Sequence, residues 1–171
     1  MSALNPERSR TPAVPKLAAT VLLLRDGHCG LEVYVQERVS SMRFAASMTV
    51  FPGGGVDKRD FPDFADSEIT SHAKLDSESR IAQSFDVDYA RAHALVCAAV
   101  RETFEETGTL LARDASGEIA SDGHRFHRQR RQLEAHELSL TEFLRQENLS
   151  LDPELVSPWA NWVTPESNPI R

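Results

Sequence analysis

Three glutamates within one short segment have the types and spacing that suit metal chemistry. They are Glu102, Glu105 and Glu106. On a helix, spacings of three and four residues place side chains on the same face, so these carboxylates would lie together. Like charges at this spacing cost a few tenths of a kcal/mol per pair, and acids are also disfavoured in the last turn of a helix. Such a cluster favours a compensating cation, and Mg²⁺ or Mn²⁺ takes oxygen ligands of this kind.

Arg101 stands immediately before this cluster. At a spacing of four residues its guanidinium can hold the carboxylate of Glu105 in one orientation. Ala98, Ala99 and Phe104 are apolar, so the same helix can pack into a core while its acids stay on one side. A solvated acidic face is the alternative interpretation, because charged side chains on helices are mostly exposed.

The segment from Arg101 to Gly108, which reads RETFEETG, resembles the second half of the Nudix hydrolase signature. That signature is Gly-x5-Glu-x7-Arg-Glu-U-x-Glu-Glu-x-Gly-U, where U is a bulky aliphatic residue. The fixed arginine, glutamates and final glycine all match in register. Gly54, preceded by Pro52 and Gly53, is similar to the first glycine of the signature and its usual neighbours.

The signature is split in this chain. Counting from Gly54, the first acidic position falls on Asp60, a shorter acid than glutamate, and the arginine would follow at position 68 instead of at Arg101. The additional residues, about 61–93, are therefore expected to form an insertion beside the site.

A second element resembles one branch of the family. The stretch from Arg43 to Gly54 reads RFAASMTVFPGG, and it is similar to the Arg-x3-Gly-x3-Phe-Pro-Gly-Gly element of coenzyme A diphosphatases, with Ser47 in place of the first glycine. This likeness implies coenzyme A or an acyl derivative as substrate. The wider family implies other nucleoside diphosphate derivatives, and that alternative stays open.

The resemblance implies hydrolysis of a diphosphate bond with the help of Mg²⁺ or Mn²⁺. Glu105 and Glu106 correspond to metal ligands of the family, Glu102 to a ligand or a base, and a backbone carbonyl near Gly54 to a further ligand. Arg101, Glu102 and Glu105 are the expected catalytic residues. Metal ions in such a site neutralise developing charge and lower the pKa of the water that attacks phosphorus.

The expected substrate-binding residues are Arg43, Gly53 and Gly54. A basic run at 125–131 adds two alternatives, a contact for a substrate phosphate or a solvated helix face. A non-catalytic Nudix-like domain that binds nucleotide or regulates another protein is the alternative function.

Composition limits the class of protein. With 171 residues, 40% of them hydrophobic, the chain suits one soluble domain. Its net charge of −7 disfavours a nucleic-acid partner. The apolar run at 17–24 is far shorter than the ~20 residues that span a bilayer. Cys29 and Cys97 are too few for a disulfide scaffold, which suits the cytoplasm.

Patterning predicts the elements that would position the site. Apolar and alternating runs predict strands at 17–24, 31–38 and 48–51, the last ended by the glycines at 53–55. The polar stretch at 56–86 lacks periodicity and is expected to be an insertion or a mobile loop. Helices are predicted at 88–111, 126–137 and 139–146. Asp86 or Asp88 is the expected cap of the first helix and Gly108 its expected end, and Ser139 with Glu142 resembles a capping box that opens the third.

The resemblance implies an α/β Nudix fold, in which a mixed β-sheet is sandwiched between helices. It covers residues 17–171 and follows a flexible arm at 1–16. Relatives continue past the segment at 162–166 with further strands and a final helix, so the C-terminal part of the fold is expected to be missing here. An uncovered sheet edge favours pairing, and a homodimer or a poorly stable monomer is therefore expected.

Overall fold

A computed structural model describes residues 15–38, 48–62, 72–120 and 123–165. Arg43, one of the expected substrate contacts, lies outside the described residues. None of the helices in the described ranges is both long enough and apolar enough to cross a membrane.

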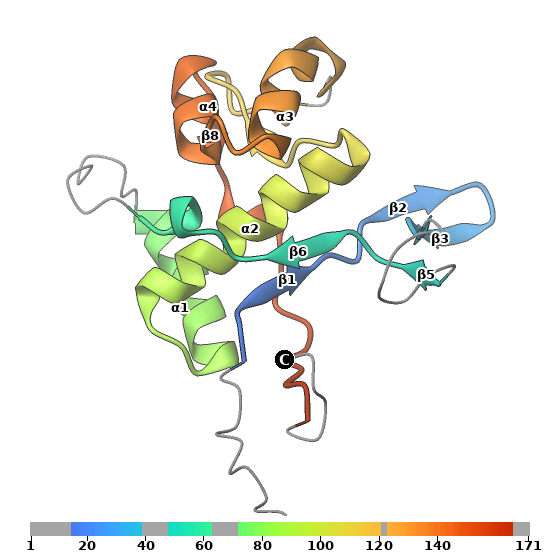
Figure 1. The fold of residues 1–171 in the computed structure, drawn as a ribbon, viewed down its shortest axis with the longest axis vertical. Helices are drawn as coiled ribbons and strands as arrows, with labels where there is room; N and C mark the ends of the chain where they lie inside the picture. Colours follow the sequence, from blue (N-terminus) through green and yellow to red (C-terminus); the bar gives the residue numbers. More distant parts are fainter. Residues whose placement is uncertain (1–14, 39–47, 63–71, 121–122, 166–171) are drawn as a thin grey trace, which may run out of the picture.

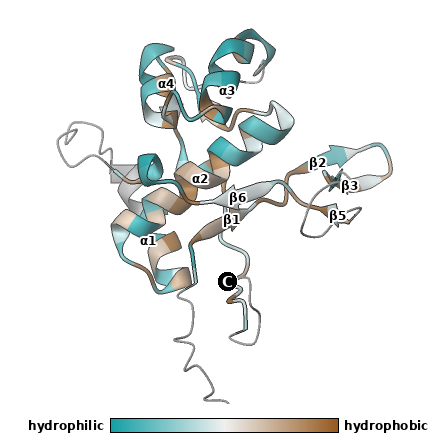
Figure 2. Cartoon of the chain, viewed as in Figure 1, coloured by the Kyte–Doolittle hydropathy of each residue, from teal (hydrophilic) through white to brown (hydrophobic). Residues whose placement is uncertain are grey.

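Helix α2, Tyr89–Thr107, is the element around which the others gather (Figure 1). It begins as predicted, because the Asp88 side chain accepts a hydrogen bond from the backbone N–H of Arg91. It ends at Thr107, before the predicted 111, and Gly108 is its cap as expected. The left-handed φ of 77° suits glycine, and the Gly108 N–H donates to the carbonyl of Phe104. Figure 2 shows α2 hydrophobic through its middle and hydrophilic toward its C-terminal end.

Every strand pair in the described residues is antiparallel and two-stranded. The mixed sheet expected from the sequence is therefore not present in these ranges. The pairs are β1 (Ala18–Thr20) with β6 (Gly53–Gly55), β2 (Leu24–Gly27) with β3 (Gly30–Val33), β4 (Gln36–Glu37) with β5 (Thr49–Val50), and β7 (Ala112–Arg113) with β8 (Ser150–Leu151).

The strand predicted at 48–51 ends before the glycines, as β5. The glycines at 53–55 then form a further strand, β6, which was not predicted. β6 runs beside β1 across α2 (Figure 1), and Gly53 is paired with Thr20. Gly53 has φ 150°, and a Cβ there would collide with the backbone of Ala19 and Thr20. Glycine thus permits a close approach of the β1 and β6 backbones. This approach lets β6 lie against α2.

The predicted buried strand at 17–24 is also wrong. The run divides between β1 and β2, and Leu24 is 52% exposed. β2 and β3 form a hairpin, because they pair antiparallel across a turn. It projects away from the helices (Figure 1), so its leucines lack the packing partners that the periodicity assumed.

Helix α1, His72–Phe85, replaces the loop that was expected at 56–86. Its buried side chains include Ser77 and Glu78 as well as Ile81. The burial of Glu78 is partly compensated by His93 of α2, whose Nδ1 lies 2.8 Å from the Glu78 Oε1. The inward face of α1 is thus partly polar, and a search for apolar periodicity does not detect it.

The C-terminal helices form one core with α2. They are α3, His127–Glu134, and α4, Leu140–Gln146, with short 3₁₀ turns η1 (Lys58–Asp60), η2 (Gly123–Phe126) and η3 (Pro153–Leu155) nearby. The rings of Phe104 and Phe143 stack with centroids 5.6 Å apart. Ser139 and Glu142 form the predicted capping box of α4. This core anchors α2.

Candidate active site

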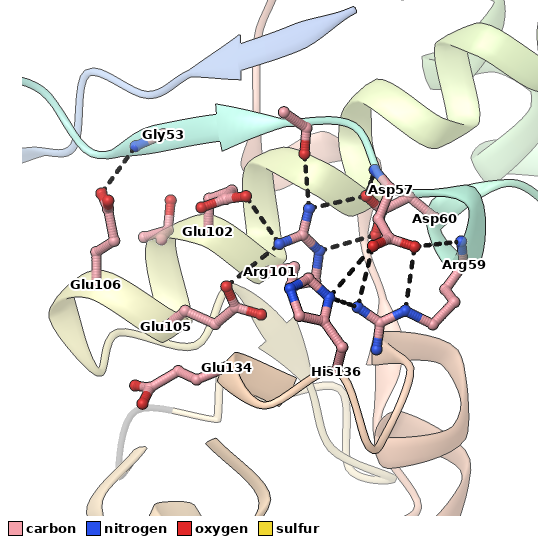
Figure 3. Close-up of polar contacts among 12 residues, drawn as sticks. Gly53, Asp57, Arg59, Asp60, Arg101, Glu102, Glu105, Glu106, Glu134 and His136 are labelled. Carbon is pink, nitrogen blue, oxygen red and sulfur yellow. Dashed lines mark hydrogen bonds and ion pairs between the residues drawn. The ribbon is translucent and has the colours of Figure 1, made fainter. Parts of the chain in front are cut away.

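One buried guanidinium organises the candidate site. Arg101 is 3% exposed, and its Nε and Nη2 each donate to one carboxylate oxygen of Asp60 at 2.9 Å. Its Nη1 donates to Glu102 at 2.8 Å and to Glu105 at 3.2 Å (Figure 3). The predicted contact between Arg101 and Glu105 is confirmed. Asp60, which stands at the first acidic position of the signature, also bonds to Arg101, although the two halves of the signature are far apart in this sequence.

Asp60 is held by the turn that carries it. It is 1% exposed, and its Oδ2 accepts a hydrogen bond from the backbone N–H of Asp57 at 2.8 Å. Asp57 in turn accepts from the backbone N–H of Arg59 at 2.9 Å, so η1 begins with a capping box. The Asp57-x-x-Asp60 spacing is the sequence signal for this turn.

Two side chains that sequence reasoning missed join this turn to the segment after α3. Arg59 Nη1 donates to the carbonyl of Leu138 at 2.8 Å, and Arg59 Nη2 also contacts His136 Nδ1. The hydrogen bonds from Arg59 hold the pKa of Asp57 well below its ordinary value. His136 has a left-handed φ of 59°. Its contact with Arg59 spans 77 positions of the sequence, so no local sequence pattern predicts it.

Glu105 has one carboxylate oxygen, Oε1, that is buried without a hydrogen-bond partner in the described residues. Burial raises the pKa of Glu105 above its ordinary value, and the nearby charge of Arg101 opposes that rise. A buried, unpaired oxygen is costly. It is the kind of atom that a bound cation would satisfy.

Glu102 lies directly against the glycine strand. A Cβ added to Gly54 would be 2.5 Å from the carboxylate carbon of Glu102. The predicted closeness of Gly54 to the acidic cluster is therefore found, and only a residue without a side chain fits beside Glu102.

Replacing Gly54 by alanine is expected to displace the Glu102 carboxylate and to weaken Mn²⁺ binding by about tenfold, the lower end for a displaced metal-site group. Gly55→Ala is the matched control, because nothing lies within 4 Å of a Cβ there. Mn²⁺ titration of both variants, with thermal unfolding alongside, measures the difference. Equal Mn²⁺ affinity in the two variants would contradict the role of Gly54.

Glu106 points to a different part of the site from Glu102 and Glu105. Its Oε2 accepts from the backbone N–H of Gly53 at 2.9 Å and from Gln36 Nε2 at 2.8 Å. In the described ranges, no three acidic, histidine or cysteine side chains converge closely enough to hold a metal. The predicted gathering of all three carboxylates is therefore not found. Arg101 holds Glu102 and Glu105, whereas Gly53 holds Glu106 (Figure 3).

The residues nevertheless fit a hard divalent cation in type. They supply carboxylate oxygens from one helical turn, beside a strand whose backbone groups are accessible at glycine positions. The unpaired Oε1 of Glu105 is a ligand atom already removed from water. Glu106 would have to exchange its contacts with Gly53 and Gln36 to join it.

Comparisons with known proteins bear on the fold. No protein-family model matches the sequence, and no curated protein matches it. A similar solved structure is described as "Crystal structure of NUDIX hydrolase from Alicyclobacillus acidocaldarius". It has a TM-score of 0.54 and 26% sequence identity over 81% of this chain. The chain spans 57% of the length of that protein. Taken with the observed helices and strands, this likeness gives the chain an α/β, Nudix-like fold.

Proposed function

We propose that this chain is a Nudix-type hydrolase that cleaves a diphosphate bond in a nucleoside diphosphate derivative with the help of Mg²⁺ or Mn²⁺. The observation that carries the proposal is the Arg101 guanidinium, shared among Asp60, Glu102 and Glu105. A purely structural ion pair needs one carboxylate, whereas this arginine gathers three and leaves an oxygen of Glu105 unpaired. The likeness to a NUDIX hydrolase supports the same reaction class.

Glu102, Glu105 and Glu106 would hold the cation, which when bound polarises a phosphoryl oxygen and acidifies a water molecule. The chain's own residues prepare that site. Arg101 fixes one oxygen each of Glu102 and Glu105, so neither carboxylate has to be ordered when a cation arrives. Asp60 in turn keeps Arg101 in place through two hydrogen bonds.

Coenzyme A or an acyl derivative is the proposed substrate, on the likeness of the stretch 43–54 to the corresponding diphosphatase element. Arg43 and the backbone at Gly53 and Gly54 are the proposed substrate contacts. The backbone N–H of Gly53 already donates to an anionic oxygen, that of Glu106. The same N–H suits a phosphate oxygen equally well.

Hydrolysis assays across coenzyme A, NADH, ADP-ribose and diadenosine polyphosphates test the proposal, each with Mg²⁺ or Mn²⁺ and with an EDTA control. We expect cleavage of coenzyme A to 3′,5′-ADP and phosphopantetheine, lost in EDTA. Cleavage of another substrate would retain the reaction class and overturn the coenzyme A assignment. Tight nucleotide binding without turnover would favour a non-catalytic binding domain, and the mass of the active species would report whether it is a homodimer.

A further inference from the structure

One arginine of the basic run on α3 faces the candidate site. Arg130 Nε and Nη2 both donate to the backbone carbonyl of Glu105, at 2.8 and 2.5 Å. Its neighbours Arg128 and Arg131 are exposed. The two alternatives from the sequence, a phosphate contact or a solvated face, therefore do not describe Arg130.

The carbonyl of Glu105 needs a partner from outside its own helix. The last carbonyls of a helix have no N–H ahead of them to accept from. The Gly108 N–H donates to Phe104, and the Thr109 N–H, which would serve Glu105 in a continuing helix, donates to Thr107 Oγ1 at 3.0 Å. Arg130 supplies the missing donors from α3.

Arg130 also compensates the unfavourable negative charge at the C-terminal turn of α2. The C-terminal end of a helix is negative, and a cation there is stabilising. Glu134, one turn further along α3, holds Arg130 Nε at 3.3 Å. A Cβ on Gly108 would lie 3.2 Å from Arg130 Nη1. The guanidinium is thus seated between the end of α2 and its own helix.

We propose that Arg130 is a positioning residue that fixes the C-terminal turn of α2 and thereby sets the geometry of Glu105 and Glu106 for cation binding. The inference rests on the proposed function for the identity of the ligand, while the contact with the Glu105 carbonyl stands by itself. Groups that support a metal ligand change metal affinity by roughly 10–100-fold when they are removed.

The test compares Mn²⁺ affinity among three variants of the full chain. Arg130→Gln is expected to weaken Mn²⁺ binding by about tenfold. Arg130→Lys keeps the charge but not the two-pronged donor, so its affinity is expected to lie between those of Arg130→Gln and the parent. Arg131→Gln, the exposed neighbour, is the matched control and is expected to bind like the parent. If Arg130→Gln loses thermal stability but keeps the parent's Mn²⁺ affinity, its role is structural only and the inference is overturned.

Amide hydrogen exchange separates this inference from the proposed function. Without metal, the amides at 107–109 are expected to exchange faster in Arg130→Gln than in the parent, because the turn loses its outside donor. A parent chain that binds no Mn²⁺ overturns the proposed function. Unchanged exchange in Arg130→Gln overturns the inference. If that variant does not fold, Arg130→Lys takes its place, and parent-like affinity and exchange there overturn the inference as well.

Discussion

Replacing Arg101 by alanine is expected to abolish hydrolysis and to lower the free energy of unfolding by roughly 3–5 kcal/mol, the usual cost of removing one partner of a buried ion pair. The reason is Asp60, which is 1% exposed and loses both of its hydrogen bonds from Arg101. Glu102 and Glu105 lose a shared donor at the same time. Denaturant unfolding and the hydrolysis assay on the same preparation measure the two effects.

Two variants sharpen this test. Arg101→Lys keeps the charge but cannot bond Asp60 with two nitrogens while reaching the glutamates, so it is expected to restore little activity. Arg113→Ala is the control, since Arg113 pairs with Asp152 but has a side chain that is 35% exposed. Pairs with this much solvent contact are worth about 0–1 kcal/mol. If Arg101→Ala unfolded at the same denaturant concentration as Arg113→Ala, the central role of Arg101 would be wrong.

Replacing Glu105 by glutamine is expected to reduce hydrolysis by at least about 100-fold, because the charge stabilisation supplied by a metal is worth several kcal/mol. The same substitution is expected to make the metal-free fold more stable at neutral pH, since it removes a charge that burial disfavours. A loss of activity together with a gain in stability would show that Glu105 serves the reaction at a cost to the free energy of unfolding. Glu137→Gln, an exposed acid, is the control and should change neither.

The pH dependence follows from the raised pKa of Glu105. In the folded chain the Glu105 carboxyl stays protonated above pH 4.5, which is its ordinary pKa. In the unfolded chain the same carboxyl loses its proton near that pH. The folded state thus binds more protons in that window, and the contribution of Glu105 to stability falls as pH rises through it. Unfolding measured in EDTA from pH 4.5 upward should show a shallower fall in Glu105→Gln than in the parent. Parallel curves would contradict the buried, proton-retaining carboxyl.

Local chemistry explains which features the sequence could predict. Asp88, Gly108 and the Ser139–Glu142 box act within a few residues of themselves, so helix ends were found. Arg101 and Glu105 meet along a single helix, so their contact was found as well. β6 and α1 were missed for a different reason. A strand of three glycines has no favourable propensity, and α1 packs on α2 partly through a polar pair, Glu78 with His93, as well as through Ile81.

The missed parts of the site all depend on contacts between distant segments. Glu106 is held by the backbone of Gly53, Arg59 by Leu138, and the end of α2 by Arg130. Backbone carbonyls and N–H groups are present at every residue, so their partners leave no trace in a pattern of residue types. Only the arrangement of elements selects them.

The Asp60–Arg101 contact bears on how long the segment between these two residues can be. The contiguous Nudix signature leaves seven residues between these positions, whereas here they lie 41 positions apart. Because the entropy of closing a flexible loop grows only with the logarithm of its length, the longer connection costs about 1.4 kcal/mol more. That cost is small, so residues can accumulate between the two halves without separating them. A sequence pattern with fixed spacing between the two positions then fails to match, although Asp60 and Arg101 still meet in the fold.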